Sequence, residues 1–306
     1  MFMKISKQFN SINEFHKFSN LPKPEHPLIS LIDYSLVDYP DEYTSIKWVQ
    51  NFYSIGLKRN VSEKFNYGQQ PYDFEEGVLS LVAPQQVIHI EIDQNAAADP
   101  SGWLLLIHPD FLWNTPLAKK MKKYEFFGYA VNEALFLSQK EENMMVEIFK
   151  NIQREYQSNI DKFTQSIIVA QIELLLHYTE RFYERQFITR QITNHKVLSQ
   201  LEELLNDYFN TEGPINKSIP SVMEVAGQLN VTPNYLSSLL KIITGQSTQQ
   251  HIHNRLIEKA KERLSTTDLS VSEIAYELGF EYPASFNKLF KKKVNLSPLE
   301  FRSTFN

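Results

Sequence analysis

The last third of the chain uses one short pattern twice, about 50 residues apart. The first copy reads Ser221-Val222-Met223-Glu224-Val225-Ala226, and the second reads Ser270-Val271-Ser272-Glu273-Ile274-Ala275, 49 residues later. Further along, the chain reads Leu239-Leu240-Lys241 and then Leu289-Phe290-Lys291. A sequence repeat indicates one structural unit that is built twice. Each copy here predicts a helix, a tight turn and a second helix.

Four capping boxes predict where helices begin in this region. In a capping box, a Ser side chain accepts a hydrogen bond from the amide three residues on, and a Glu or Gln at that position reaches back to the Ser amide. The four pairs are Ser221 with Glu224, Ser247 with Gln250, Ser270 with Glu273, and Ser297 with Glu300. One such pair is a weak signal, but four at repeat-related positions strongly indicate helix starts.

The second helix of each copy separates apolar from polar positions. In the first copy the residues expected to face inward are Leu236, Leu239 and Leu240, and those expected to face outward are Asn234, Ser237, Ser238 and Lys241. In the second copy the inward set is Phe286, Leu289 and Phe290, and the outward set is Pro283, Ser285, Asn287, Lys288 and Lys291. Residues 248–264 are predicted to form one continuous helix between the copies.

The outward sets consist of short polar and basic side chains on rigid helices. An Asn side chain can form a pair of hydrogen bonds with adenine, and a Ser hydroxyl can form hydrogen bonds with several kinds of group. A Lys ammonium group can reach guanine or phosphate. Two helices joined by a tight turn fit the major groove of DNA, and free amides at a helix start can hold a phosphate. A single amphipathic helix of this kind is more often a solvated surface. Two matched units favour DNA recognition.

Three segments, at 255–264, 274–292 and 297–302, closely resemble the AraC/XylS family of bacterial transcription regulators. The second reads Ile274-Ala275-Tyr276-Glu277-Leu278-Gly279-Phe280 and continues to Lys292. The resemblance implies an all-α DNA-binding domain over 195–306. It also implies helix-turn-helix units at 221–243 and 270–293, whose reading helices enter successive major grooves.

The resemblance also places contacts on individual residues. Base contacts are implied for Asn234, Ser237, Ser238, Ser285, Asn287 and Lys288. Phosphate contacts are expected at Lys241, Ser221, Ser270, Lys291 and Lys292. The first reading helix departs from the family, with Ser238 in place of a basic residue and Leu240 in place of Phe, so its contacts are expected to be weaker. Asn295 replaces a Gly, which suits a left-handed backbone.

Residues 1–190 predict a different architecture, so the chain as a whole is predicted to be an α+β multidomain protein. Turn signals separate short β-rich segments over 28–109, which indicates a small barrel or sandwich. The segments are 28–32, 46–53, 78–82, 87–92 and 103–107. Helices follow over 110–190, including 138–156 and 162–187, and 184–196 reads as a polar linker. The family resemblance implies that this half is a cupin-like sensor with dimerising helices.

The helix at 162–187 carries two apolar stripes, which is more than one core contact requires. The first stripe is Ile168, Ile172, Leu175 and Phe182, and the second is Ile167, Ala170 and Leu174. Either the second stripe faces another subunit in a homodimer, or the helix is buried on both sides within one domain. The sequence leaves both alternatives open.

Composition excludes several classes of function. There is no cysteine, so disulfides and thiolate metal sites are excluded. The chain has no 18-residue apolar run and no signal peptide, so we expect a cytoplasmic protein without a membrane partner. Its net charge is −5, but residues 221–306 hold ten Lys or Arg against eight Asp or Glu, a net charge of +2.

The remaining candidate sites are weak. His89, Glu91 and a distant His108 are too few ligands for a cupin metal site, and His251 and His253 face different ways on a helix. We therefore expect no enzyme and no cofactor. Trp48, Tyr53, Trp103 and Trp113 could line a ligand cavity, although most such aromatic residues belong to a core.

The sequence predicts a DNA-binding transcription regulator that binds double-stranded DNA as a homodimer. A small-molecule effector at the N-terminal domain and RNA polymerase are further candidate partners. The alternative is a cupin-type metalloenzyme with a DNA-binding tail.

Overall fold

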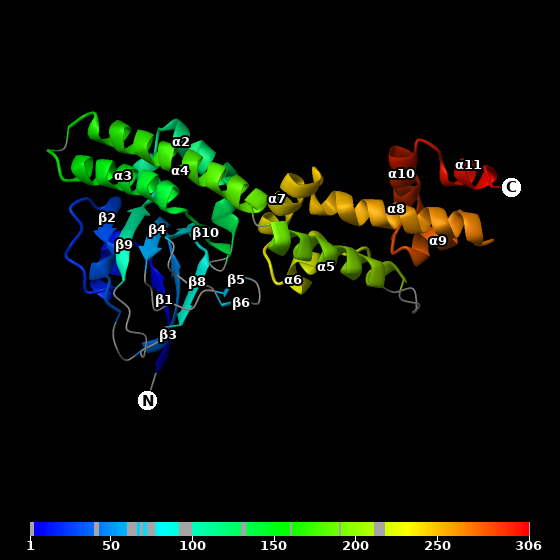
Figure 1. Ribbon diagram of the computed structural model, residues 1–306, viewed down its shortest axis with the longest axis horizontal. Helices are drawn as coiled ribbons and strands as arrows, with labels where there is room; N and C mark the ends of the chain where they lie inside the picture. The colour runs from blue at the N-terminus through cyan, green and yellow to red at the C-terminus, as the bar shows by residue number, and fades with distance from the viewer. Residues whose placement is uncertain are drawn as a thin grey trace. The chain divides into compact units, whose positions relative to one another are not determined.

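The computed structural model describes residues 3–39, 43–59, 66–67, 70–71, 77–91, 100–129, 133–159, 161–189, 191–210 and 218–305. The chain divides into two compact units, Met1–Thr189 and Arg190–Asn306. The first unit contains β-sheets and helices, and the second is helical in its described residues (Figure 1).

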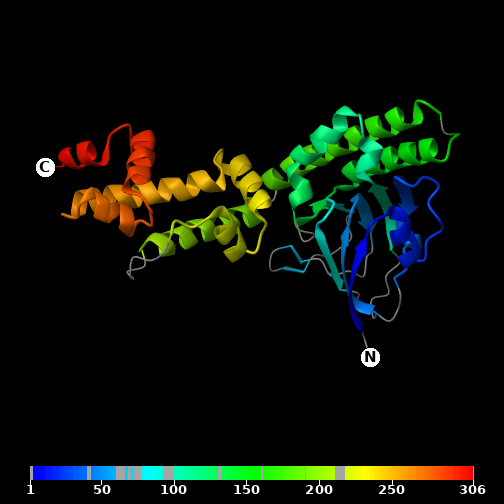
Figure 2. The same ribbon diagram turned by 180° about the vertical axis from the view of Figure 1, so that it is seen from behind.

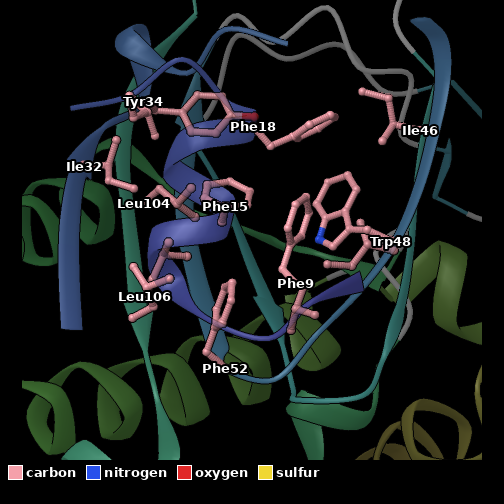
Figure 3. Close-up of a cluster of buried hydrophobic side chains, with 14 residues drawn as sticks. Phe9, Phe15, Phe18, Ile32, Tyr34, Ile46, Trp48, Phe52, Leu104 and Leu106 are labelled. Carbon is pink, nitrogen blue, oxygen red and sulfur yellow. The ribbon is translucent and has the colours of Figure 1, made fainter. Parts of the chain in front are cut away.

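The first unit contains two larger sheets. The three-stranded sheet has the order β1 (Met3–Phe9), β3 (Tyr43–Gln50) and β8 (Val87–Glu91). The five-stranded sheet has the order β10 (Leu135–Phe136), β7 (Val78–Val82), β4 (Tyr53–Arg59), β9 (Ser101–Ile107) and β2 (Ile29–Asp33). The strands β5 (Asn66–Tyr67) and β6 (Gln70–Pro71) pair to form a small antiparallel ribbon. The two larger sheets face each other across a core of aromatic and aliphatic side chains (Figure 3).

The predicted single strand at 46–53 is wrong. The chain leaves β3 at Gln50 and enters β4 at Tyr53, so it passes from one sheet to the other across only Asn51 and Phe52. No Gly or Pro marks this corner. It is held by Gln50, whose side-chain amide donates to the Phe52 carbonyl at 2.9 Å. The predicted strands at 28–32, 78–82, 87–92 and 103–107 are confirmed as β2, β7, β8 and β9.

Neither β1 nor α1 (Ile12–Phe18) was predicted from the sequence. A local signal for α1 does exist, because the Ser11 side chain accepts from the Glu14 amide and Glu14 accepts from the Asn10 amide. For β1 the signal is weak, because Lys and Ser interrupt its apolar residues. Its partner β3 runs parallel to it and lies far along the chain.

Helices cover one face of the five-stranded sheet. The long ones are α3 (Gln139–Tyr156) and α4 (Thr164–Thr189), which pack side by side (Figure 1). Shorter elements are α2 (Pro116–Lys120), η1 (Tyr34–Leu36), η2 (Pro109–Leu112), η3 (Met121–Lys123) and η4 (Glu125–Gly128). Both predicted long helices are confirmed, and α3 begins with a capping box formed by Ser138 and Glu141.

The predicted linker at 184–196 is wrong, because α4 continues to Thr189 and α5 begins at Gln191. The polar composition of this segment suggested a linker, but it includes side chains that the fold buries. Gln186 is fully buried. It accepts from the Phe136 amide at 2.8 Å and donates to the Ala134 carbonyl at 3.3 Å, so it bonds the edge strand β10.

The second unit contains α5 (Gln191–Asn210), α6 (Val222–Gln228), α7 (Pro233–Thr244), α8 (Thr248–Thr266), α9 (Val271–Glu277), α10 (Pro283–Val294) and α11 (Pro298–Ser303). One core joins α5, α6, α7 and the first part of α8, and a second core joins the rest of α8 to α9, α10 and α11. The four predicted capping boxes and the continuous connecting helix are confirmed.

Candidate nucleic-acid interface

The turns of the two helix pairs have the same geometry. Asn230 lies between α6 and α7 with φ of 56°, and Gly279 lies between α9 and α10 with φ of 86°. Asn and Gly tolerate this left-handed conformation, which most residues avoid. The amide of Val231 donates to Ala226 at 3.1 Å, and that of Phe280 donates to Ala275 at 3.0 Å. The sequence repeat is therefore a structural repeat.

The buried faces of α7 and α10 determine which residues are exposed. Leu236, Leu239 and Leu240 are buried in α7, and Phe286 and Phe290 are buried in α10. Each helix ends at a residue with left-handed backbone, Gly245 or Asn295, as expected for Asn295 from the sequence. The opposite faces carry the residues for which base contacts were predicted.

The exposed face of α7 is weakly basic. Asn234 and Lys241 are exposed, whereas Ser237 and Ser238 are partly buried. The Ser237 hydroxyl lies 3.1 Å from that of Thr248, a fully buried residue at the start of α8. The Ser237 hydroxyl thus takes part in helix packing, and Asn234 is the most accessible of the three predicted base contacts in this helix.

The exposed face of α10 is strongly basic. Ser285, Asn287, Lys288, Lys291 and Lys292 are all exposed. With Lys293, the helix carries four lysines, whereas α7 carries only Lys241. Residues three and four positions apart share one side of a helix, so Lys288 lies beside Lys291 and Lys292. This arrangement can attract an anion along the second half of α10.

Ser221 and Ser270 have little capacity left for a phosphate. In both, the hydroxyl accepts from the Glu amide at 3.2 Å and the Ser amide donates to the Glu carboxylate at 2.7 Å. Backbone and side-chain hydrogen bonds with Ser221 lower the pKa of Glu224, and those with Ser270 lower the pKa of Glu273. These carboxylates are ionised at neutral pH and would compete with a phosphate at the helix start.

The helix α8 holds the two pairs in one unit. Arg302 of α11 donates to the carbonyls of Leu264 at 3.2 Å and Leu269 at 2.6 Å. Arg263 of α8 forms an ion pair with Glu277 of α9. Figures 1 and 2 show from opposite sides that α7 lies near the start of α8 and that α9 and α10 lie beside its middle and second half.

The residues considered as metal ligands do not form a metal site in the described part of the chain. Within the described part of the chain, no three His, Cys, Asp or Glu residues gather as a metal site would require. His89 is exposed on β8, and His108 accepts from the Asp110 amide at the start of η2. The Glu91 side chain lies outside the described residues. His251 contacts the Thr244 hydroxyl at 2.9 Å, and His253 contacts Gln249 at 2.8 Å.

Of the four aromatic residues considered for a cavity, only Trp48 lines the space between the sheets. Trp103 stacks on Phe149 of α3 with ring centroids 6.4 Å apart, and Tyr53 meets Phe127 at 5.0 Å. Trp113 is 69% exposed. The cavity itself lies between β3, β4, β7, β8 and β9.

The second stripe of α4 is not buried within the first unit. Ile167 and Leu174 are each 43% exposed, and Ala170 is also exposed. The neighbouring Phe163 extends the stripe and is 54% exposed. The first stripe is buried as predicted. The alternative that one domain buries both sides of this helix is therefore wrong.

Comparison with known proteins places the second unit among transcription regulators. A family model described as a helix-turn-helix domain matches residues 225–304. The HTH-type transcriptional regulator YfiF of Bacillus subtilis is 29% identical over 146 residues, which are 48% of this chain and 43% of that protein. The transcriptional activator RhaS of Salmonella paratyphi B is 31% identical over 135 residues, 44% of this chain and 46% of that protein. The chain therefore spans less than half the length of either relative.

Among solved structures, the C-terminal domain of the response regulator yesN from Fusobacterium nucleatum is 31% identical. The match covers 33% of this chain and 96% of that chain, with a TM-score of 0.29. These relatives regulate transcription and are not named as enzymes, which agrees with the prediction of a protein that is not an enzyme. In the described residues no helix is both long and apolar enough to span a bilayer.

Proposed function

Because residues 225–304 form a helix-turn-helix domain of the AraC/XylS type, we propose that the protein is a sequence-specific DNA-binding regulator of transcription. Its two helix pairs are two helix-turn-helix units that read successive major grooves of one duplex. The N-terminal unit is a cupin-like sensor that responds to a small-molecule effector. The protein works in the cytoplasm, where a regulator meets chromosomal DNA, and RNA polymerase is a further candidate partner.

The observation that carries this proposal is the repetition of one helix pair along a single connecting helix, α8. The 19 residues of α8 give a rod of about 28 Å at 1.5 Å per residue. One turn of B-DNA is about 34 Å long. Two reading helices held on one rod keep a fixed separation, which the reading of successive major grooves on one duplex requires.

The reading helices are proposed to contribute unequally. We assign base contacts to Asn234, Ser238, Ser285, Asn287 and Lys288, with Ser237 as a weaker candidate because its hydroxyl contacts Thr248. We assign phosphate contacts to Lys241, Lys291 and Lys292. Amides in the first turns of α6 and α9 are weaker phosphate candidates because the capping carboxylates lie there. Phosphate contacts govern affinity and salt dependence, so α10 is expected to hold the duplex more tightly.

We also propose that the protein is a homodimer, with the exposed stripe of α4 as the contact. Phe163, Ile167 and Leu174 recur at helical spacing and present apolar surface to solvent in the single chain. An exposed apolar stripe on a long helix is typical of a helix–helix interface. A dimer would place two DNA-binding units on neighbouring sites and raise the affinity for a double site.

A selection from random duplexes tests the proposed function. Full-length protein is incubated with a pool of random 40-base-pair duplexes at low salt, and bound DNA is sequenced after several rounds. We expect an enriched motif with two subsites about one helical turn apart, and binding that weakens steeply as salt rises. A pool that stays random after repeated rounds would contradict the proposal.

A further inference from the structure

The two helix pairs differ at the residue that precedes the reading helix. A proline begins both α7 and α10, so Thr232 and Tyr282, which precede these prolines, occupy equivalent positions of the repeat. The Thr232 hydroxyl accepts a hydrogen bond from the Tyr235 amide at 3.3 Å and so caps α7. The Tyr282 side chain forms no such bond, and the amide of Ser285 donates to the Tyr282 backbone carbonyl at 3.0 Å instead.

This missing cap sets α10 apart from its neighbours. Within residues 218–305, the helices α6, α8, α9 and α11 each begin after a Ser whose hydroxyl accepts from the first turn, and α7 begins after Thr232. Ser and Thr are preferred at this position because their short side chains reach the free amides. Positions that break a local rule of this kind are expected to be functional or strained, so Tyr282 requires another explanation.

The two pairs also place their aromatic ring differently. In the first pair the ring belongs to Tyr235, the third residue of α7, which is only 2% exposed. The equivalent third residue of α10 is Ser285, which is exposed, and the ring belongs to Tyr282, which is 62% exposed. The core of the second pair is formed by other residues, among them Phe286 and Phe290. The Tyr282 ring is therefore presented to solvent at the start of the reading helix.

The start of α10 differs in charge from the rest of the helix. Ala284 and Ser285 are exposed and uncharged, and the first charged residue within the helix is Lys288. The N-terminal residues of a reading helix contact base edges, whereas lysines bind phosphates. A phosphate beside Tyr282 would also approach the exposed carboxylate of Glu281, the preceding residue, which disfavours it. The position of Tyr282 therefore favours a base edge.

We propose that Tyr282 is a further specificity-determining residue, whose ring packs against the C5-methyl group of a thymine in the second subsite. Among the four DNA bases, only thymine presents a methyl group in the major groove, and apolar side chains contact it there. A Tyr ring supplies a large apolar surface while its hydroxyl stays in contact with water. This inference rests on the proposed function, because it names part of what the second reading helix recognises.

Replacement of thymine by uracil tests the proposal. The motif enriched from the random duplexes is synthesised with each thymine replaced in turn by uracil, which removes only the methyl group and keeps the base pair. Burial of one group of this size corresponds to a factor of about four in affinity. We therefore expect replacement of one thymine to weaken binding about fourfold in anisotropy titrations at constant salt. A motif in which every thymine tolerates the replacement would overturn the proposal.

Variants then assign the contact to Tyr282. Tyr282→Thr copies the first pair and should remove the difference between thymine and uracil at the sensitive position. Tyr282→Phe retains the ring and should preserve that difference. Tyr276→Ala is the matched control, because Tyr276 is 50% exposed but lies in α9, outside the reading helix.

Two results with these variants would contradict the contact. One is a thymine preference that survives in Tyr282→Thr. The other is a loss of affinity for all sequences alike in Tyr282→Phe, which would show that the hydroxyl binds a phosphate.

Thermal unfolding provides a second measurement, which does not depend on DNA. Tyr282→Thr supplies α10 with the cap that it lacks, so the unfolding temperature should rise. A rise together with a lost thymine preference would show that Tyr282 serves recognition at the expense of stability. An unfolding temperature that does not rise would show that the ring itself stabilises the helix, and would remove the argument for a binding role.

The two hypotheses fail in distinguishable ways. A wild-type protein that selects no motif removes the proposed function, and the role of Tyr282 with it. A wild-type protein that selects a motif whose thymines all tolerate uracil leaves the regulator in place and removes only the role of Tyr282.

Discussion

The ammonium group of Lys293 donates to Oδ1 of Asn254 at 2.9 Å, and this bond ties the end of α10 to the middle of α8. The Asn254 amide in turn donates to Oε1 of Gln246 at 2.8 Å, in the connection between α7 and α8. Three side chains therefore link the second reading helix, the rod and the end of the first reading helix. The apolar cores set the fold of each pair, and we expect this polar link to fix the spacing between the pairs.

Asn254→Ala removes both bonds of this link. We expect the free energy of unfolding to fall by about 1–2 kcal/mol, since each hydrogen bond contributes about 0.5–1.5 kcal/mol. Affinity for a duplex with both subsites should fall more than affinity for a duplex with one. Urea unfolding and fluorescence anisotropy measure the two effects. Gln249→Ala is the control, because the Gln249 side chain bonds His253 of its own helix. Equal losses on both duplexes would show that the link does not set the spacing.

Base and phosphate contacts on α10 should differ in their salt dependence. Asn287→Ala and Lys288→Ala should relax sequence preference and cost about 1–3 kcal/mol per good base contact. Lys292→Ala should weaken binding to all sequences alike and reduce the salt slope by about one. Anisotropy titrations at several salt concentrations check both, with Lys150→Ala in the first unit as control. The same pattern of loss for Lys288 and Lys292 would contradict their separate roles.

Substitutions of Ser237 and Asn234 in α7 should differ in their effects on stability and on DNA recognition. Ser237→Ala leaves the buried hydroxyl of Thr248 without its hydrogen bond, so it should lower the free energy of unfolding by about 1–3 kcal/mol. Asn234→Ala removes an exposed side chain and should leave stability within about 0.5 kcal/mol while it changes sequence preference. Thermal unfolding and the random-duplex selection measure these effects. A specificity change with Ser237→Ala at unchanged stability would restore Ser237 as a base contact.

The capping carboxylates should make the second unit sensitive to acid. The pKa values of Glu224, Glu273 and Glu300 are lowered by hydrogen bonds with Ser221, Ser270 and Ser297. A folded-state pKa below the unfolded value of about 4.3 gives stability that is full above that pH and lost as the pH falls through the folded pKa. Urea unfolding between pH 7 and pH 3 should show this loss. In Glu273→Gln the loss should be smaller, and an unchanged profile would rule out a contribution from Glu273.

The exposed stripe of α4 should determine the oligomeric state. Ile167→Asp or Leu174→Asp places a charge in the proposed interface and should convert a dimer to a monomer, as measured by sedimentation velocity. Ser166→Asp, exposed on the same helix, is the control and should remain dimeric. A wild-type protein that sediments as a monomer at micromolar concentration, or a dimer that survives both substitutions, would remove α4 as the contact.

The helical repeat could be predicted from short-range signals along the chain. A capping box such as Ser270 with Glu273, or a left-handed residue such as Asn295, involves residues within three or four positions of each other, so each signal is complete in a short segment. The buried faces of α7 and α10 follow from the same local periodicity. For this reason the helix starts, and the buried and exposed faces of the two reading helices, could be predicted without a structure.

Contacts between distant residues could be established from the folded chain alone. It showed that Gln50 and Tyr53 belong to different sheets, that Ser237 contacts Thr248, and that Lys58 lies inside a cavity. Each of these depends on packing between segments that are remote in the sequence or belong to different elements. Local patterns fix the torsion angles and faces of single elements, but the solvent exposure of a side chain depends on which other elements cover it.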